Sequence, residues 1–413
     1  MVIRKHRKTA VPISDYRATT ADYLLGVRLV RLPTAGNLSS SITNMNGLKS
    51  LKHLDIYISK SPLSHQSFVE TSGSQIELLN FETYYWICAP TLKMFGFSDS
   101  PPPSSPPDPS KLTLRPEECQ TLTLSDTRKL GFATYGSTNT SHPVVFLFHG
   151  LPGCRIVGRS FDKVCKKIGA RLITIDRPGC GLSTLADRGL TEWPKDVVSL
   201  ADHLGIERFS VFGASGGGPY ALACARYIPK ERLRSTTVVC GIGPIEALLD
   251  TTPYLSWRLG GFTPWSLKIA ARYLVLPALV RPYLTKDPSR LKRVLEDQAK
   301  TPEEKEQFSK DTDGGTNLDD VVASLLETFK QGLGGVMQDG AVLARDWGFD
   351  LSDVDAEKIW LIHGDQDAQA PAKVAQWIDE RLGGGKLRLL EGKTHFTIWK
   401  EHTEEMFRQS AEA

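Results

Sequence analysis

A glycine-rich turn with one serine at its centre constrains the fold of this chain more than any other stretch. Residues 210–225 read as a short buried strand, then Gly213-Ala214-Ser215-Gly216-Gly217, then a helix. A serine at the tip of such a turn projects its hydroxyl out of the sheet, and small neighbours let strand and helix pass closely. The N–H of Gly216 and the helix N-terminus then favour an oxyanion beside the hydroxyl. The turn therefore predicts a nucleophilic Ser215.

The turn alone also fits a purely structural connection between a strand and a helix, or a phosphate-binding loop. It matches neither the dinucleotide pattern G-x-G-x-x-G nor the phosphate loop G-x-x-x-x-G-K-[ST]. The choice between a structural turn and a nucleophile therefore depends on the rest of the chain.

Charge and cysteine content exclude several classes of protein. The net charge of +3 over 413 residues is small and scattered, so we expect no nucleic-acid partner. The seven cysteines are an odd number with no C-x-x-C pair and no zinc spacing, which predicts free thiols in a reducing compartment. No apolar run is long enough to cross a membrane. The basic segment Met1–Lys8 lacks the apolar core of a secretory signal. We therefore expect a cytoplasmic protein, with mitochondrial import through this basic N-terminus as the alternative.

The chain divides by pattern into four parts. Residues 1–110 form an N-terminal extension of unknown structure that ends in a Pro/Ser linker, Ser98–Ser110, typical of extended backbone. Apolar runs then alternate with helical stretches over residues 111–243 and resume over 346–413. This alternation predicts an α/β fold, a mostly parallel sheet with helices on both faces. Residues 244–345 interrupt it with a helical, aromatic-rich stretch, which we expect to be a cap over the carboxyl edge of the sheet.

Three loops with polar residues follow expected strands, at the sheet edge where ligands of such folds bind. His149–Gly153 follows a buried strand and could offer the N–H of Leu151 to an oxyanion. In His363–Pro371, Gly364 makes the turn and Asp367 lies further out on the loop, so Asp367 is the acid expected to orient a histidine. Asp365 could instead cap the turn or the following helix. Lys393–Phe396 contains His395, a candidate general base. The order Ser215, Asp367, His395 is that of a hydrolase on this scaffold.

These stretches together resemble the α/β-hydrolase fold superfamily, in its large group of capped serine hydrolases. The resemblance covers residues from about 116 to 413 and implies an eight-stranded type of sheet. It rests on His149–Gly153, on the D-R-P-G-C-G-L-S loop Asp176–Ser183, on Gly213–Gly217, on Gly364–Pro371 and on Thr394–His395.

The resemblance implies a catalytic triad and no cofactor or metal. Ser215 is then the nucleophile, His395 takes its proton and Asp367 orients the imidazole, while the N–H groups of Leu151 and Gly216 form the oxyanion hole. Relatives that open epoxides or displace halide carry aspartate in place of Ser215, and proline aminopeptidases typically carry tryptophan in place of Gly216. Hydrolysis of a carboxylic ester or thioester is therefore the first expectation. An acyltransferase, a lactonase or a carbon–carbon bond hydrolase would use the same triad.

The expected substrate is a small apolar molecule bound between the core and the cap. Candidate binding residues are Gly150, Tyr254, Trp257 and Trp265, although the aromatic ones would equally pack the cap's own core. A ligand receptor that keeps the scaffold without turnover is a second hypothesis. A third places the basic and apolar stretch 267–284 on a lipid surface. The sequence leaves the oligomeric state undetermined.

Overall fold

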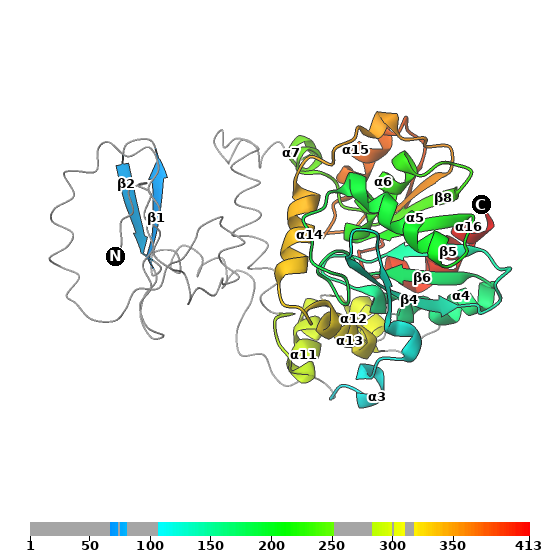
Figure 1. Cartoon of the computed structure of the whole chain (residues 1–413), viewed down its shortest axis with the longest axis horizontal. Helices are drawn as coiled ribbons and strands as arrows, with labels where there is room; N and C mark the ends of the chain where they lie inside the picture. The colour runs from blue at the N-terminus through cyan, green and yellow to red at the C-terminus, as the bar shows by residue number, and fades with distance from the viewer. Residues whose placement is uncertain (1–66, 73–74, 81–105, 252–282, 300, 310–317) are drawn as a thin grey trace. The chain divides into compact units, whose positions relative to one another are not determined.

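The computed structural model divides the chain into two units, residues 1–99 and 100–413 (Figure 1). The residues that the structure describes are 67–72, 75–80, 106–251, 283–299, 301–309 and 318–413. In the first unit, β1 (Ser67–Ser72) and β2 (Gln75–Asn80) pair as an antiparallel hairpin. The division at residue 99 falls within the Pro/Ser stretch that the sequence shows as a linker.

The second unit is built on an eight-stranded sheet in the order β10-β9-β8-β7-β5-β6-β4-β3. The β3–β4 and β4–β6 pairs are antiparallel and the other pairs are parallel. The mostly parallel α/β sheet predicted from the sequence is therefore confirmed. The strands are β3 (Gln120–Thr123), β4 (Lys129–Gly136), β5 (Val144–Phe148), β6 (Arg171–Ile175), β7 (Phe209–Ala214), β8 (Leu233–Val239), β9 (Ile359–Gly364) and β10 (Leu387–Leu390).

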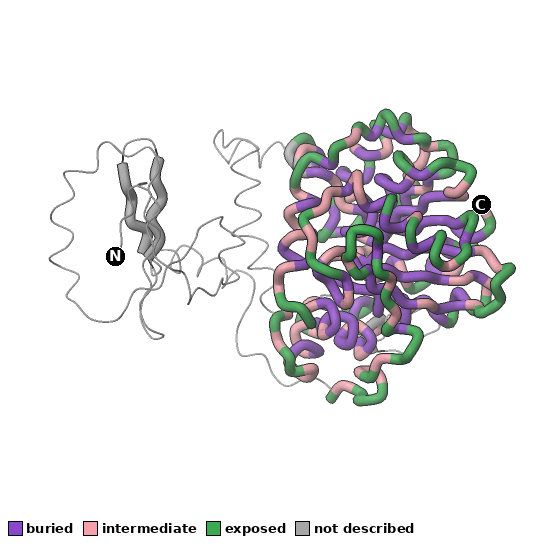
Figure 2. The backbone as a smooth tube through the Cα atoms, in the orientation of Figure 1, coloured by how far each residue is buried: buried purple, intermediate pink, exposed green. Residues whose placement is uncertain are grey.

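Helices cover both faces of this sheet because successive strand residues point to opposite sides. Phe146 and Phe148 of β5 pack in one core with α5 (Trp193–His203), α6 (Gly218–Tyr227) and α15 (Ala372–Arg381). Val145 and Leu147 pack in a second core on the other face, with α4 (Asp162–Ile168) and α16 (Ile398–Glu412). Figure 2 shows the central strands buried between these helical layers.

The segment between β8 and β9, for which the sequence predicts a cap, is helical in its described part. It comprises α7 (Ile245–Thr251), α11 (Pro288–Gln298), α12 (Pro302–Ser309), α13 (Leu318–Thr328) and α14 (Gly334–Ala344). Tyr254, Trp257 and Trp265, the expected substrate-binding residues of the cap, lie outside the described residues.

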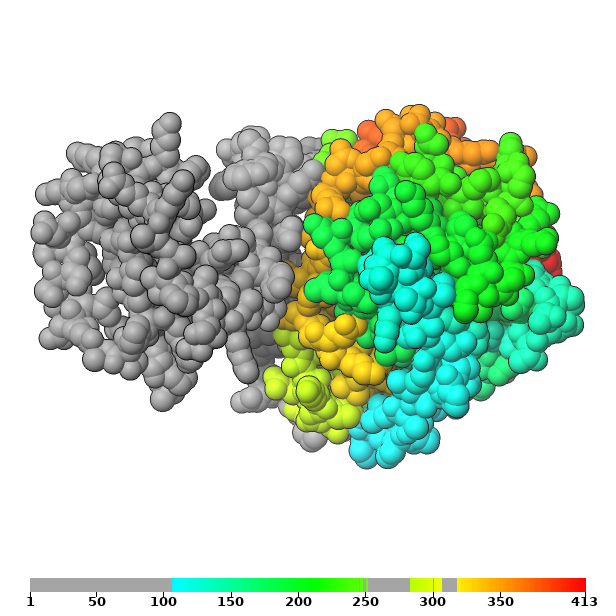
Figure 3. Space-filling model, in the orientation of Figure 1, coloured from blue at the N-terminus to red at the C-terminus, as the bar shows by residue number. Residues whose placement is uncertain are grey.

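A buried ion-pair network joins the start of the second unit to its core and to α13. The short helix α3 (Pro109–Leu112) leads into a 3₁₀ turn that ends at Glu118, whose side chain is fully buried. Glu118 pairs with Arg159 at 2.5 Å, and Arg155 pairs with Asp176 at 2.8 Å and with Glu327 of α13 at 2.9 Å. Figure 3 shows the residues that follow position 106, in cyan, against the yellow surface of α13. The strap of residues 108–118 therefore belongs to the second unit.

In the part of the chain that the structure describes, no helix combines the length and the apolar character needed to cross a membrane.

Candidate active site

The topology of the sheet brings the nucleophile turn next to the loop that follows β5. These parallel strands are neighbours, with Phe148 opposite Gly213. From β5 the chain moves outward to β6 and then returns to β7 on the other side of β5. Such a reversal of strand order opens a crevice at the carboxyl ends of the strands, where ligands of α/β folds bind. Ser215 and the loop His149–Gly153 both lie at this point.

Ser215 sits at the tip of a turn that only glycine neighbours permit. Its φ of +51° places it in the left-handed region, which is uncommon for a residue with a side chain. A methyl group on Gly217 would lie 2.1 Å from the carbonyl oxygen of Phe148, and one on Gly213 would lie 2.5 Å from the carbonyl oxygen of Gly217. The glycines therefore allow β5, β7 and α6 to approach closely, and the half-buried Ser215 is held between them.

The two loops that carry the expected oxyanion donors, Leu151 and Gly216, lie against each other beside Ser215. A methyl group on Gly216 would lie 3.2 Å from the backbone nitrogen of Leu151 and 2.9 Å from its Cβ. A methyl group on Gly150 would lie 3.9 Å from the Ser215 Oγ. The loop after β5 therefore passes within van der Waals distance of the nucleophile turn, and small residues at both positions leave room there.

Asp367 and His395 are brought together by the pairing of β9 and β10. Gly364 at the end of β9 lies opposite Leu390 at the end of β10, so the two following loops start side by side. The Nδ1 atom of His395 lies 2.7 Å from Oδ2 of Asp367. Oδ1 of Asp367 accepts hydrogen bonds from the backbone N–H groups of Gln369 at 2.9 Å and Ala370 at 2.8 Å. The carboxylate is thereby fixed on one side and binds the imidazole with the other.

The electrostatics keep the buried Asp367 ionised. Burial alone would raise the pKa of its carboxyl, but the hydrogen bond and charge of His395 and the N–H of Ala370 lower the pKa below the usual value. Asp365, the alternative acid, is exposed to solvent. Of the two aspartates, the structure places Asp367 against His395.

His149 is a buried residue of the β5 loop with a fixed tautomer. Its Nε2 accepts the backbone N–H of Arg177 at 3.3 Å, so its Nδ1 carries the proton and donates to the Gly150 carbonyl at 2.8 Å. Burial and the charge of Arg177 hold the pKa of His149 well below its usual value. A neutral ring with both nitrogens bonded is a structural element of the loop.

Arg177, from the D-R-P-G loop, joins the β5 loop to two residues that sequence reasoning did not select. Its guanidinium donates to the carbonyl oxygens of His149 at 2.5 Å and Gly150 at 2.8 Å. It also pairs with Asp339 of α14 at 2.6 Å, and Asp339 accepts the hydroxyl of Tyr220 at 2.7 Å. Arg177, Asp339 and Tyr220 are all buried.

A sequence signal for Asp339 exists in the pattern of α14. Val336 and Val342 lie three residues to either side of Asp339, so a helix places the aspartate on its apolar face. A lone carboxylate on a buried face requires a partner, because unpaired buried charges are strongly unfavourable. The identity of the partner, 162 residues earlier in the chain, carries no local signal.

Cys240 and His363 surround the other side of Asp367. Their donor atoms and a carboxylate oxygen of Asp367 lie within 4.8 Å of one another, a spacing that metal ligands can have. His363 already donates its Nε2 proton to the carbonyl oxygen of Ala370 at 2.7 Å, and burial lowers its pKa. Burial and the charge of Asp367 raise the pKa of the Cys240 thiol well above its usual value. Metal ligation needs a thiolate, whereas here the thiol is protonated and the imidazole is neutral and already hydrogen-bonded. We therefore interpret His363 and Cys240 as residues that pack against Asp367 and support it, and not as metal ligands.

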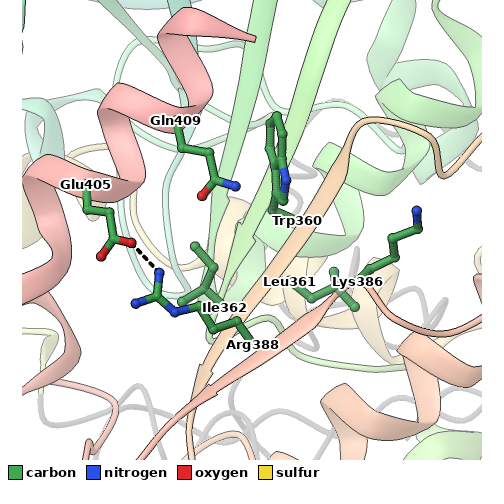
Figure 4. A pocket seen from close by; sticks show the side chains of 7 residues that line it. All are labelled: Trp360, Leu361, Ile362, Lys386, Arg388, Glu405 and Gln409. Carbon is green, nitrogen blue, oxygen red and sulfur yellow. Dashed lines mark hydrogen bonds and ion pairs between the residues drawn. The ribbon is translucent and has the colours of Figure 1, made fainter.

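Two surface pockets of the described residues lie elsewhere. One, of about 200 Å³, opens between β9, β10 and α16, where Arg388 pairs with Glu405 (Figure 4). The other, of about 570 Å³, lies between α4 and α16 and carries both lysines and glutamates. Ser215, Asp367 and His395 are not among the residues that line these two pockets.

Comparisons with known proteins agree with this fold. A proline iminopeptidase of Xanthomonas citri is 35% identical over 118 residues, which are 27% of this chain and 36% of that protein. The magnesium-chelatase 30 kDa subunit of Rhodobacter capsulatus is 38% identical over 96 residues, 22% of this chain and 33% of that protein. The chain therefore spans about a third of the length of these curated relatives.

Among solved structures, E-2-(acetamidomethylene)succinate hydrolase superposes with a TM-score of 0.50 at 16% identity, over 71% of this chain and 98% of that one. A likeness at this identity concerns the fold. The sequence profile of the Alpha/beta hydrolase family matches residues 144–409, which include the sheet from β5 onward and all three polar loops. By its sheet topology and by this match, the chain belongs to the alpha/beta hydrolase family of enzymes.

Proposed function

We propose that this protein is a serine hydrolase that cleaves a carboxylic ester or thioester through an acyl-enzyme on Ser215. The observation that carries the proposal is the 2.7 Å contact between His395 and an ionised, buried Asp367, in a fold that also displays Ser215 on a left-handed turn. A histidine oriented by a carboxylate and a serine on a nucleophile elbow are the parts that acyl transfer requires.

In the proposed reaction, His395 acts first as base and then as acid. Its Nδ1 is bonded to Asp367, so Nε2 is the nitrogen that takes the Ser215 proton. The Ser215 Oγ attacks the carbonyl carbon, and the imidazolium then protonates the departing alcohol or thiol. Water, deprotonated by the same Nε2, attacks the acyl-enzyme, and the imidazolium returns that proton to Ser215 Oγ as the bond to the acyl group breaks and the carboxylic acid leaves. Asp367 stays ionised and stabilises the imidazolium at both stages.

The N–H groups of Leu151 and Gly216 are the proposed oxyanion donors. They come from the two loops that meet beside Ser215, and the start of α6 adds partial positive charge. Loss of one donor in such a site costs about 2.7–4 kcal/mol of transition-state stabilisation. These two N–H donors and the helix N-terminus would distinguish a catalytic serine turn from a purely structural one.

Peptide hydrolysis is a second candidate because several of the curated relatives are proline iminopeptidases. Gly216 after the serine argues against it, because proline aminopeptidases typically carry tryptophan there. Acyl transfer, lactone opening and carbon–carbon bond hydrolysis would use the same three residues. A receptor without turnover would need no aligned acid–histidine pair. The described cysteines are free, which fits the expected cytoplasmic, reducing location.

Labelling with a fluorophosphonate probe tests the proposal without knowledge of the substrate. The wild-type protein is expected to react, whereas Ser215→Ala and His395→Ala are not. Panels of p-nitrophenyl esters, acyl thioesters and prolyl amides then assign the leaving group. A folded wild-type protein that resists the probe would refute the hydrolase and favour a receptor. Turnover of prolyl amides above esters would favour the peptidase.

A further inference from the structure

We propose that Asp339, on α14, is a positioning residue for the oxyanion hole and acts through Arg177 on the Gly150–Leu151 peptide group. The inference rests on the proposed function and deepens it. It assigns a role in turnover to a residue that lies on a helix of the cap segment and outside the triad.

The peptide group between Gly150 and Leu151 ties the direction of a carbonyl to that of an N–H. The carbonyl of Gly150 and the N–H of Leu151 belong to one planar unit, and in a trans peptide they point in opposite directions. The carbonyl is held from one side by Arg177 Nη2 at 2.8 Å and by His149 Nδ1 at 2.8 Å. The Leu151 nitrogen lies on the other side, 3.2 Å from a methyl group placed on Gly216. Fixing the carbonyl therefore fixes the direction of the N–H that would face an oxyanion.

Arg177 can hold this carbonyl only while its own charge is neutralised. Its side chain is fully buried, and an unpaired buried cation would be strongly unfavourable. Asp339 supplies the counter-charge through Oδ2, which accepts Nε at 2.8 Å and Nη2 at 2.6 Å. The same Nη2 binds the Gly150 carbonyl, so one nitrogen links the carboxylate to the peptide group.

Tyr220 fixes the carboxylate in turn. Its hydroxyl donates to Oδ1 of Asp339 at 2.7 Å, and the Arg177 guanidinium lies 4.8 Å from the centre of its ring. Tyr220 belongs to α6, the helix that starts at Gly218 after the turn Ser215–Gly217. The network therefore connects the nucleophile helix, the oxyanion loop and α14.

Close backbone packing of α14 fixes the position of Asp339. A methyl group on Gly335 would lie 2.2 Å from the carbonyl of Gly179, so α14 touches the backbone of the D-R-P-G loop directly. Displacement of α14 would withdraw the carboxylate from Arg177 and release the Gly150 carbonyl. The position of this helix is thus coupled to the geometry of the oxyanion hole.

A merely structural ion pair would behave differently, and the molecule offers a matched control. Glu327 of α13 pairs with the buried Arg155 at 2.9 Å, which also joins the cap segment to the core. Arg155 binds Asp176 and the Glu118 carbonyl, not the carbonyls of the oxyanion loop. Glu327→Gln should therefore lower stability without altering the oxyanion hole.

The test compares Asp339→Asn, Tyr220→Phe and Glu327→Gln with the wild-type protein. Each is assayed with p-nitrophenyl butyrate, and active sites are counted with a fluorophosphonate. For Asp339→Asn we expect kcat per active site to fall between about 10-fold and 1,000-fold with KM nearly unchanged, because a donor that faces only the transition state is displaced. Tyr220→Phe should show a smaller loss of the same kind, and Glu327→Gln should keep the wild-type kcat per site.

A second readout reports the oxyanion directly. An alkyl trifluoromethyl ketone labelled with ¹³C at the carbonyl forms a hemiketal on the serine, and NMR follows its ionisation. In Asp339→Asn the pKa of the hemiketal should rise, while in Glu327→Gln it should match the wild type. If Asp339→Asn fails to fold, the kcat and hemiketal pKa of Tyr220→Phe decide the question.

A wild-type hemiketal pKa and a wild-type kcat per site in the folded Asp339 or Tyr220 variants would overturn the positioning role alone. A wild-type protein that neither labels nor turns over would refute the proposed hydrolase and this inference with it. The two failures are therefore distinguishable.

Discussion

Ser215, the proposed nucleophile, has an unfavourable backbone conformation. A side chain in the left-handed region costs roughly 1–2 kcal/mol, a cost that glycine does not bear. We therefore expect Ser215→Gly to have a higher free energy of unfolding than Ser215→Ala by about 1 kcal/mol. Both variants lack the hydroxyl, so the difference between their free energies of unfolding, measured by denaturant titration, reports the cost of the left-handed backbone conformation alone. Equal stability would show that the surrounding strands relieve the strain at φ +51°.

The two loop aspartates allow a sharp comparison at the acid position. Asp367→Asn should lower kcat by about 10⁴-fold, because an amide can hold the imidazole in the wrong tautomer. Asp365→Asn should leave most of the activity, since its side chain is exposed and His395 bonds to Asp367. Steady-state kinetics of both variants on one p-nitrophenyl ester provide the measurement. The reverse order of losses would reassign the acid.

The cysteines should differ sharply in reactivity. Burial raises the pKa of the Cys154 thiol to about 12, so at pH 8 it stays protonated as well as enclosed. Cys119 is exposed and should be alkylated by iodoacetamide in the native protein. Peptide mass spectrometry before and after denaturation provides the readout and its control. Alkylation of native Cys154 would mean that the loop beside the oxyanion donors opens. Cys88 lies outside the described residues.

Among the elements, the strap of residues 108–118 is held by buried charge as well as by the apolar contacts of Leu112 and Leu114. Glu118 accepts two hydrogen bonds from Arg159 and one from the hydroxyl of Tyr135. Removal of one partner of a buried ion pair costs about 3–5 kcal/mol, so Glu118→Gln should lose stability of this order at pH 7.

The pH dependence of that loss follows from the sign of the pKa shift. Burial alone would raise the pKa of Glu118, but hydrogen bonds from Arg159 and from the Arg115 N–H lower it below the usual value. Glu118 therefore stabilises the fold fully at pH values above the pKa of its carboxyl in the unfolded chain, which is about 4.3. This stabilisation is lost as the pH falls through the lower pKa that the carboxyl has in the folded protein. The stability difference between wild type and Glu118→Gln should therefore shrink below about pH 4 in urea titrations. A difference that stays constant to pH 2 would contradict the assignment.

The elements also differ in how far the sequence predicts them. β5 and β7 could be read within two residues, because strands buried on both faces are continuous apolar runs. The loops bearing Ser215, Asp367 and His395 could be placed because each follows a strand that the sequence predicts, although β10, before His395, is a half-exposed edge strand. Arg155 and Arg159 could not be placed in the interior, because charged residues are usually exposed. Their partners lie up to 172 residues away in the chain. The pattern of α14 places Asp339 on an apolar face but does not identify Arg177 as its partner.

At the scale of the whole molecule, the two units should be separable. A chain of residues 106–413 keeps the strap and the complete sheet, so we expect it to fold and to react with the fluorophosphonate as the full chain does. A chain that begins at Gln120 leaves Arg159 without Glu118 and should be markedly less stable in thermal melts. Loss of reactivity in the longer of these chains would show that residues 1–105 contribute to the site.

The last helix has a consequence for how the protein is made. Phe407 of α16 stacks on Phe212 of β7, with ring centres 4.5 Å apart, and so closes one face of the nucleophile strand. Until the ribosome has translated α16, the apolar side chains on that face of β7 remain exposed in the nascent chain, and exposed apolar surface promotes aggregation. Asp367 and His395 also come much later in the chain than Ser215. Closure of this face of the sheet and assembly of the proposed triad therefore both wait for the synthesis of α16 and of the two loops before it.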